Sequence, residues 1–313
     1  MSDSLFAALR VAMPMMLLMV IGWLCRTRGL IDRPAMKQYD RLIFWLFMPL
    51  LLFKNIYEID FSQGFAVKEM LFVAAGLLLN FAFCMKFPRL LTDDPRKSSV
   101  IGQAVVRGNY ILFGVVVCEA LYGEGRTGMV IMLGVLVIPA INIFSAVILE
   151  AGRNRQADLG KLLLAILKNP MIIGAILAFM CKGFGLTVPA PMWSVIRSIA
   201  NSTTTVSFLS LGVGLDMAEA VSDRRLLAWG VFLRLFAVSG VFMPLAVFAG
   251  FRNESLCAMM VVFAAPSAVA SYPMAVAMGA DGQLAGQLVC VTTVLSVLTI
   301  FLWTFALRML GLM

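Results

Sequence analysis

The chain has 313 residues, of which 61% are hydrophobic and 13% are charged, and its formal net charge is +8. Soluble domains are about half apolar and about one quarter charged, so this composition excludes an ordinary soluble protein and favours one that lipid surrounds. Nucleic-acid binding is not expected, because the Lys and Arg residues form short clusters between apolar runs, as in cytoplasmic loops.

Ten apolar runs follow one another along the chain, and each can form a transmembrane helix. They span residues 5–25, 42–57, 67–87, 100–122, 129–149, 162–181, 199–215, 226–251, 256–278 and 284–307. The second run is short, but Arg41 and Lys54 flank it, and their long side chains can extend its effective span. The sequence therefore predicts an all-α integral membrane protein with ten transmembrane helices in a single domain covering residues 1–313.

The distribution of positive charge predicts the orientation in the membrane. Loops after odd-numbered runs carry 14 Lys and Arg residues, and the opposite side carries 8. Because positive loops favour the cytoplasm, we expect the odd-numbered loops inside the cell and both termini outside it, in the cell (inner) membrane.

The two halves of the chain resemble each other when one is shifted by 156 residues. The shift places Pro14 on Pro170, Cys25 on Cys181, Gly29 on Gly185 and Gly123 on Gly279, and it brings the first five runs into register with the last five. Since five helices are an odd number, the second copy must enter the membrane from the opposite face. We expect inverted 5+5 repeats over residues 5–150 and 161–308, a build common among secondary transporters.

Runs four and nine, which are equivalent under this shift, carry signs of a break near the middle of the membrane. Arg107 lies nine residues after Ser98, or about 14 Å along a helix, which is close to the centre of a ~30 Å hydrocarbon core. Gly108 weakens the fourth helix, and Pro266 and Pro273 remove backbone donors from the ninth. Backbone freed by such breaks is tolerated beside protein or a watery cavity, where helix ends can also hold a substrate.

Arg107 admits two interpretations, an anion-binding residue or a cap for carbonyl groups that the break frees. Two further groups of polar residues lie inside the runs, Asn142 and the stretch Asn201 to Thr205. They can line a pathway or form hydrogen bonds to neighbouring helices. Arg234 lies eight residues from its helix end, from which it can reach toward the membrane interface. The candidate substrate-binding residues are Arg107, Gly108, Asn109, Tyr110, Asn142, Pro266, Ser267 and Ser271.

An enzyme is not expected. The chain has no histidine, which removes the usual general base and the commonest metal ligand. Neither a nucleophile elbow nor a phosphate-binding loop is present, and the six cysteines show no Cys-x-x-Cys spacing. We therefore expect no cofactor and no metal site.

Several segments together resemble the auxin efflux carrier family of permeases, relatives of the plant PIN-formed carriers. They are the run from Arg41 through Pro49 to Phe53, Arg107-Gly108-Asn109-Tyr110 to Gly114, Lys168-Asn169-Pro170, Ser210 to Leu215, and Ala265 to Ala275. The resemblance covers essentially the whole chain. It implies ten helices in two inverted repeats, crossing helices 4 and 9 at the substrate site, and alternating-access transport of organic anions such as auxin or small dicarboxylates, often by dimers. The position of Asn109 matches an asparagine at the family's crossing.

We therefore expect a secondary transporter of a small organic anion, and two alternatives stay open.

 The first is a sodium-coupled symporter of the related bile-acid type, although the ninth run has no charged residue to serve as a sodium ligand. The second is a membrane sensor that transports nothing. Among coupling ions, a proton or none is expected before sodium, and a homodimer in the lipid bilayer is expected as the assembly.

Overall fold

The computed structural model describes residues 2–58, 66–153, 159–214 and 223–313, and in these ranges helices joined by turns and loops are the regular structure, apart from one isolated bridge between two extended segments. The first half contains α1 (Ser2–Thr27), α2 (Arg33–Leu42), the π-helical turn η1 (Ile43–Phe47), α3 (Met48–Tyr57), α4 (Val67–Lys86), α5 (Pro88–Leu91), α6 (Pro95–Val106), α7 (Tyr110–Tyr122) and α8 (Gly128–Arg153).

The second half follows the same order of apolar runs, but its helices are divided at other points. It contains α9 (Leu159–Leu167), α10 (Pro170–Gly183), α11 (Ala190–Gly214), α12 (Arg224–Phe232), the π-helical turn η3 (Leu233–Ala237), α13 (Val238–Phe248), α14 (Asn253–Ala264), α15 (Ser271–Ala277) and α16 (Gly282–Met309). Within the described residues, each of the ten apolar runs expected from the sequence overlaps one or more of these helices.

Some helices begin at a different residue from the one expected, because a polar side chain caps the start of the helix. The second run is helical from Arg33, because Asp32 accepts a hydrogen bond from the backbone N–H of Ala35 and so caps the helix before the apolar stretch begins. The sixth run is interrupted at Asn169, which caps α10 through the N–H of Met171 and is followed by Pro170. Local polar chemistry at the helix ends therefore overrides the apolar pattern.

Four helical segments are long and apolar enough to cross a membrane, and they are Val67–Leu91, Gly128–Arg153, Arg224–Phe248 and Gly282–Met309. Shorter apolar helices are Ala12–Thr27, Tyr110–Tyr122, Pro170–Gly183 and Asn253–Ala264. Many large apolar side chains on these helices are exposed, which suits contact with lipid rather than water. Ten complete crossings remain a prediction.

Matching turns occur at positions 156 residues apart. Gly29 and Gly185 have φ angles of 70° and 64°, and the next residue in each turn donates its N–H to the carbonyl of Cys25 or Cys181. Such left-handed turns at helix ends favour glycine, because it lacks a Cβ. The two halves thus share the geometry of this helix end.

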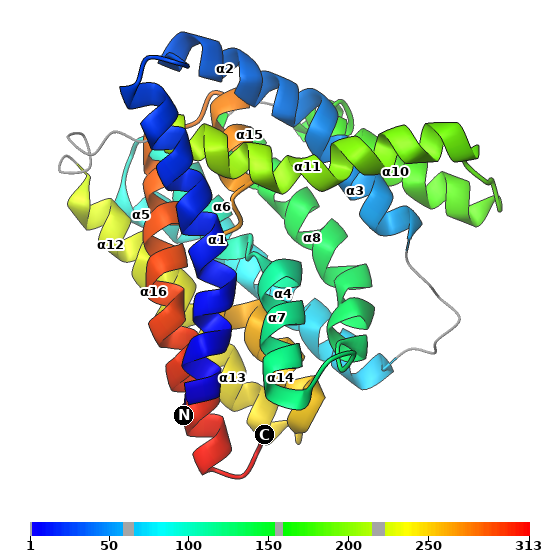
Figure 1. Cartoon of the computed structure of the whole chain (residues 1–313), viewed down its shortest axis with the longest axis vertical. Helices are drawn as coiled ribbons and strands as arrows, with labels where there is room; N and C mark the ends of the chain where they lie inside the picture. The colour runs from blue at the N-terminus through cyan, green and yellow to red at the C-terminus, as the bar shows by residue number, and fades with distance from the viewer. Residues whose placement is uncertain (1, 59–65, 154–158, 215–222) are drawn as a thin grey trace.

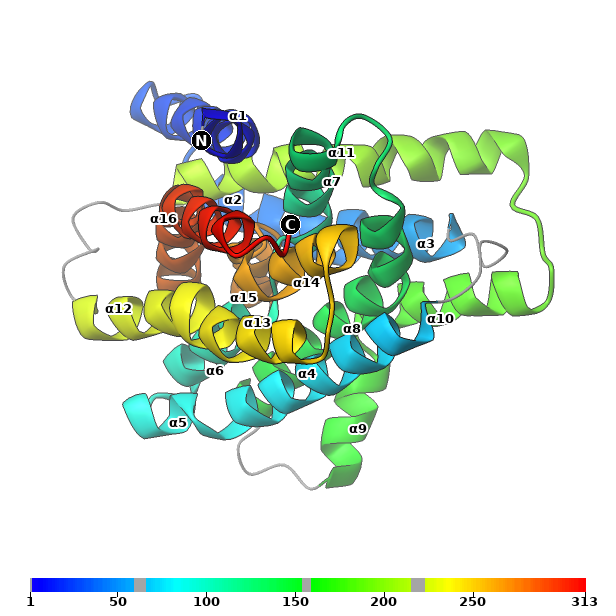
Figure 2. The ribbon, with the colours of Figure 1, turned by 90° about the horizontal axis from the view of Figure 1, so that it is seen from below.

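The long helices α1 and α16 run side by side, and α1 begins at the end of the molecule where α16 finishes (Figure 1). Two glycines let α1 approach α11 closely, since a Cβ on Gly22 or Gly212 would overlap the backbone of the other helix. Seen from below, α14 lies near the centre of the molecule, and it packs against α7, α13 and α16 (Figure 2).

The fourth and ninth runs are each divided into two helices, and their connecting segments meet. Residues 107–109 link α6 to α7, and residues 265–270 link α14 to α15. Gly108 and Ser267 form an antiparallel bridge, with N–H groups of Asn109 and Ala268 donating to the carbonyls of Pro266 and Arg107 at 2.8 and 2.9 Å. We call these two connecting segments the junction.

Candidate functional site

A cavity of about 410 Å³ lies beside the junction, and this volume is within the range of small-ligand sites. Its walls come from α3, α8, α10 and α11, and the junction and the first turn of α7 close one side. Its lining residues with polar side chains are Lys54, Asn55, Glu58, Arg107, Asn109, Tyr110, Asn142, Asn201 and Thr204.

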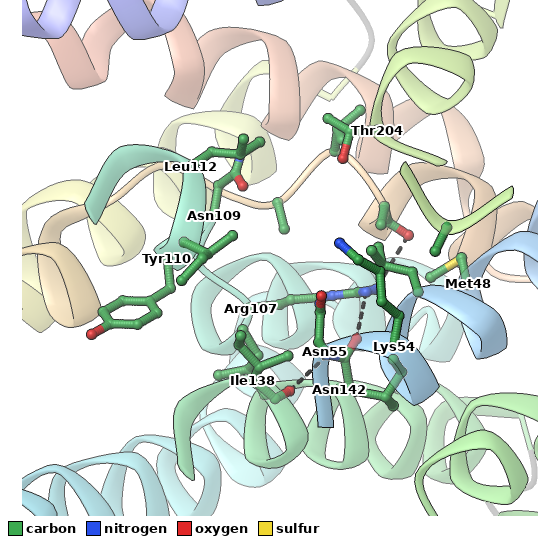
Figure 3. Close-up of a pocket in the computed structure, with 18 of the residues that line it drawn as sticks. Met48, Lys54, Asn55, Arg107, Asn109, Tyr110, Leu112, Ile138, Asn142 and Thr204 are labelled. Carbon is green, nitrogen blue, oxygen red and sulfur yellow. Dashed lines mark hydrogen bonds between the residues drawn. The ribbon is translucent and has the colours of Figure 1, made fainter. Parts of the chain in front are cut away.

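Arg107 extends from the junction toward α8 and α15. Its guanidinium donates to the Asn142 side-chain oxygen at 2.6 Å (Figure 3). It also donates to the Ala270 carbonyl at 3.2 Å and contacts the Met274 sulfur at 3.1 Å. These contacts involve three of the five N–H donors of a guanidinium, so donors remain for a carboxylate in the cavity. Asn142 is itself positioned by donating to the Ile138 carbonyl at 2.7 Å.

Asn109 places an amide at the start of α7. Its side chain is 8% exposed, and the Nδ2 atom is buried with no hydrogen-bond partner among the described residues. The following residues, Tyr110, Ile111 and Leu112, also line the cavity, and their backbone N–H groups belong to the first turn of α7. A helix N-terminus carries partial positive charge, so this side of the cavity favours an anion.

Of the remaining residues predicted for the site, Tyr110 lines the cavity, and Pro266, Ser267 and Ser271 do not. Tyr110 directs its ring away from Arg107, and its hydroxyl donates to the Val130 carbonyl at 2.8 Å (Figure 3). Pro266 and Ser267 hold the junction together and do not line the cavity, since the Ser267 hydroxyl donates to the Ala104 carbonyl at 2.9 Å. Ser271 is buried outside the cavity lining, and its hydroxyl has no partner among the described residues.

Arg234 was expected to be able to reach toward the membrane interface, but it is buried and points to the junction instead. Arg234 is 1% exposed and lies in η3, where its guanidinium donates to carbonyls of both divided helices. The bonds reach Val105 at 2.7 Å, Ala265 at 2.7 Å and Val262 at 3.3 Å. Arg234 therefore caps the C-terminal ends of α6 and α14, whose last carbonyls have no partner within their own helices.

The position of the Arg234 side chain requires a glycine at residue 108. A Cβ at this position would overlap the Arg234 guanidinium, which occupies the space beside the Gly108 backbone. The glycine thus does more than weaken the helix, because it admits the side chain that caps the break.

Lys54 was expected only as a flanking residue, but it lines the cavity with Arg107. Its ammonium group is 3.4 Å from a carboxylate oxygen of Glu58, whose other oxygen is 3.4 Å from Arg197. Two cations and one carboxylate therefore line the cavity, and this excess of positive charge favours an anionic ligand. The signal available in the sequence was a lysine directly after the apolar part of the second run.

One ion pair outside the expected spans joins α6 to the second half of the chain. Lys97 lies 2.7 Å from Asp223, and hydrogen bonding to that carboxylate raises the pKa of the Lys97 ammonium group. The contact holds the end of α6 that lies away from the junction next to the start of α12.

Comparisons with known proteins agree with a transport role. Residues 8–304 match the family described as membrane transport protein. Relatives described as the uncharacterized transporter YfdV occur in Escherichia coli strains K12 and O157:H7 and in Shigella flexneri. Each is 20% identical over 308 residues, covering 95% of this chain and 96% of the relative.

Proposed function

Because this chain belongs to the membrane transport protein family, we propose that it is a secondary transporter that carries a small organic anion with a carboxylate group. The substrate binds in the cavity beside the junction and reaches the two sides of the membrane by alternating access. The observation that carries this proposal is that Arg107 lines the same cavity as Asn109, whose Nδ2 atom has no hydrogen-bond partner in the part of the chain that the structure describes.

The argument is electrostatic. A carboxylate that enters the membrane loses its water, at a cost of several kcal/mol unless hydrogen bonds and charge replace it. Arg107 supplies a charged donor, Asn109 supplies an amide, and the first turn of α7 supplies backbone N–H groups. Residues 107 and 109 would point about 200° apart on an intact helix, but here both belong to the extended junction and line one cavity.

The matching order of apolar runs and the matching turns support inverted repeats as the framework of transport. In this arrangement α6 and α7 correspond to α14 and α15, and the junction is the place where the two divided helices cross. Broken helices that meet near the middle of the membrane provide a site that each side can reach in turn.

Binding can be tested with the purified full chain by measuring thermal unfolding in the presence of short mono- and dicarboxylic acids. We expect at least one acid to raise the unfolding temperature. Arg107→Ala should weaken its binding by about 10- to 100-fold, because a hydrogen bond to a charged group contributes about 1.5–3 kcal/mol. Arg107→Lys, which keeps the charge but loses the fork, should weaken binding less.

Asn109→Ala should also weaken binding, while Lys86→Ala is the matched control, because Lys86 is an exposed cation at the end of α4. An acid that stabilises the wild type, Arg107→Ala and Asn109→Ala equally would exclude the cavity beside the junction as its binding site. Uptake into proteoliposomes, measured with the acid that binds best, then tests transport itself.

A further inference from the structure

A carboxyl group is buried on α2, outside the lining of the cavity. Asp40 is 1% exposed, and α2 packs against α11, α15 and η1. In Figure 1, α2 and α15 lie together at the end of the molecule opposite the start of α1. The carboxyl group thus occupies an interface between an outer helix and the second half of a divided helix.

The surroundings of Asp40 supply hydroxyl groups rather than positive charge. The Ser210 hydroxyl donates to Oδ1, and the Tyr272 hydroxyl lies close enough to interact with the same carboxyl group. Oδ2 is buried and has no hydrogen-bond partner of standard geometry among the described residues. Gly214 provides the space for the tyrosine, because a Cβ there would overlap the Tyr272 hydroxyl.

Within the described ranges, no cation forms an ion pair with Asp40. On α15 the titratable group is Tyr272, and η1 has none. On α11 it is Arg197, which is within 3.4 Å of Glu58. The cations Lys37 and Arg41 of α2 itself are exposed, and Arg26 of α1 donates to the Val213 carbonyl at 3.4 Å.

A carboxylate in such a place is costly, because burial removes water and no positive charge replaces it. The neutral acid avoids this cost, and its proton can be donated to a neighbouring oxygen. A carboxyl group that is buried in one arrangement and hydrated in another therefore takes up and releases a proton as its surroundings change. Ionisable residues inside membrane proteins commonly serve as proton relays for this reason.

Asp40 is connected to the cavity through one short segment. Tyr272 lies two residues after Ala270, whose carbonyl accepts a hydrogen bond from Arg107. The start of α15 therefore contacts the cavity arginine through its backbone and Asp40 through the tyrosine. The segment that packs against Asp40 is thus the same segment that Arg107 contacts.

We propose that Asp40, with Ser210 and Tyr272, forms a proton-binding site whose occupancy is coupled to the position of α15. One proton adds to the carboxylate to give the neutral acid, and no other bond is formed or broken. The use of this proton in transport rests on the proposed function, but its binding to Asp40 does not.

Proton binding is tested by infrared spectroscopy of the purified full chain in lipid nanodiscs, titrated from about pH 5 to about pH 9, a range that covers a carboxyl group whose proton affinity burial has increased. The wild type should show a protonated-carboxyl band that disappears as the pH rises. Asp40→Asn should lack this band. Asp32→Asn should retain it, because Asp32 is an exposed residue at the start of the same helix.

Coupling is tested by hydrogen–deuterium exchange of residues 268–278, with wild type and Asp40→Asn compared at the same pH. Since asparagine mimics the neutral acid, the two proteins should exchange alike at the low-pH end of the titration and differ at the high-pH end. Equal exchange at both ends would refute coupling, and a band that persists in Asp40→Asn would refute the proton site itself.

If Asp40→Asn does not fold, Asp40→Glu serves in its place, and the band should then move in frequency. A band that does not move would also refute the assignment. Neither measurement uses an organic anion, so the proton site can fail or hold independently of the proposed anion transport.

Discussion

The two buried arginines next to the junction do different things. Arg234 bonds to three backbone carbonyls, and the structure gives it no place in the cavity lining. Arg107 lines the cavity and bonds to one carbonyl, one amide oxygen and one sulfur. The role of cap, which the sequence left open for Arg107, is thus performed at the ends of α6 and α14 by Arg234.

Replacing Arg234 should therefore damage stability. Arg234→Ala removes the arginine donor from three buried carbonyls, and that of Val105 keeps a 3.5 Å bond from the Asn80 amide. Each carbonyl left unpaired costs about 1–3 kcal/mol. We expect the unfolding temperature of the purified protein to fall by at least about 5 °C. The matched control is Arg126→Ala, because Arg126 is an exposed arginine paired with Glu254. Equal unfolding temperatures for Arg234→Ala and the control would show that the capping bonds contribute little.

The sequence predicted part of the cavity lining, because the expected depth of a polar residue in the membrane indicates that it lies near the centre. Arg107, Gly108, Asn109 and Asn142 were all expected and all line the cavity. Pro266 and Ser267 were expected too, but they support the junction from behind, and a sequence does not show which side of an extended segment faces a cavity. Arg234 shared with Arg107 the signal of an arginine within an apolar run, and its interpretation failed because snorkelling and capping cannot be distinguished without the partner helices.

At the scale of the elements, the junction depends on the absence of a side chain at Gly108. Gly108→Ala places a methyl group where the Arg234 guanidinium lies, so the capping bonds and the bridge to Ser267 cannot both persist. We expect a lower unfolding temperature and faster amide exchange in residues 105–110 than in the wild type.

Gly240→Ala is the matched control for this substitution, because a Cβ on Gly240 of α13 meets no atom within 4 Å. Alanine in a helix interior is favoured over glycine by about 1 kcal/mol, so the control should be neutral or slightly stabilising. Comparable losses in the two variants would argue against a specific role for the space at Gly108.

The order and type of the elements were predictable because apolar runs report helices in a membrane protein directly. The interruptions in the fourth and ninth runs were also predictable, from Gly108 and Pro266. The helix boundaries were less predictable. For example, α11 begins at Ala190, nine residues before the expected start, because polar residues such as Ser194 and Arg197 continue the helix beyond the apolar stretch. The π-helical turns η1 and η3 left no mark in the apolar pattern.

For the whole molecule, the family assignment confirms the resemblance to auxin efflux carriers. The chain is accordingly a multi-pass membrane protein of a transporter family. The substrate class, the inverted repeats and the homodimer remain proposals. A sequence shows which helices exist, but the chemistry of a cavity depends on side chains that distant helices bring together, such as Lys54 and Asn201.

Orientation is the prediction that belongs to this scale. The excess of Lys and Arg in the odd-numbered loops, 14 against 8, places both termini outside the cytoplasm. A reporter that fluoresces only in the cytoplasm should stay dark when fused after Met313, and the same reporter inserted in the loop after α8 should fluoresce. A bright C-terminal fusion would reverse the orientation or change the number of crossings.

The bonds that Arg234 makes to both divided helices have a mechanical consequence. Because one side chain fastens the end of α6 to the end of α14, the two helices cannot slide past each other without leaving carbonyls unpaired in an apolar interior. They behave as one stiff block. The cavity walls formed by α3, α10 and α11 lie outside this block, so the proposed alternating access predicts that the cavity opens by movement along those walls.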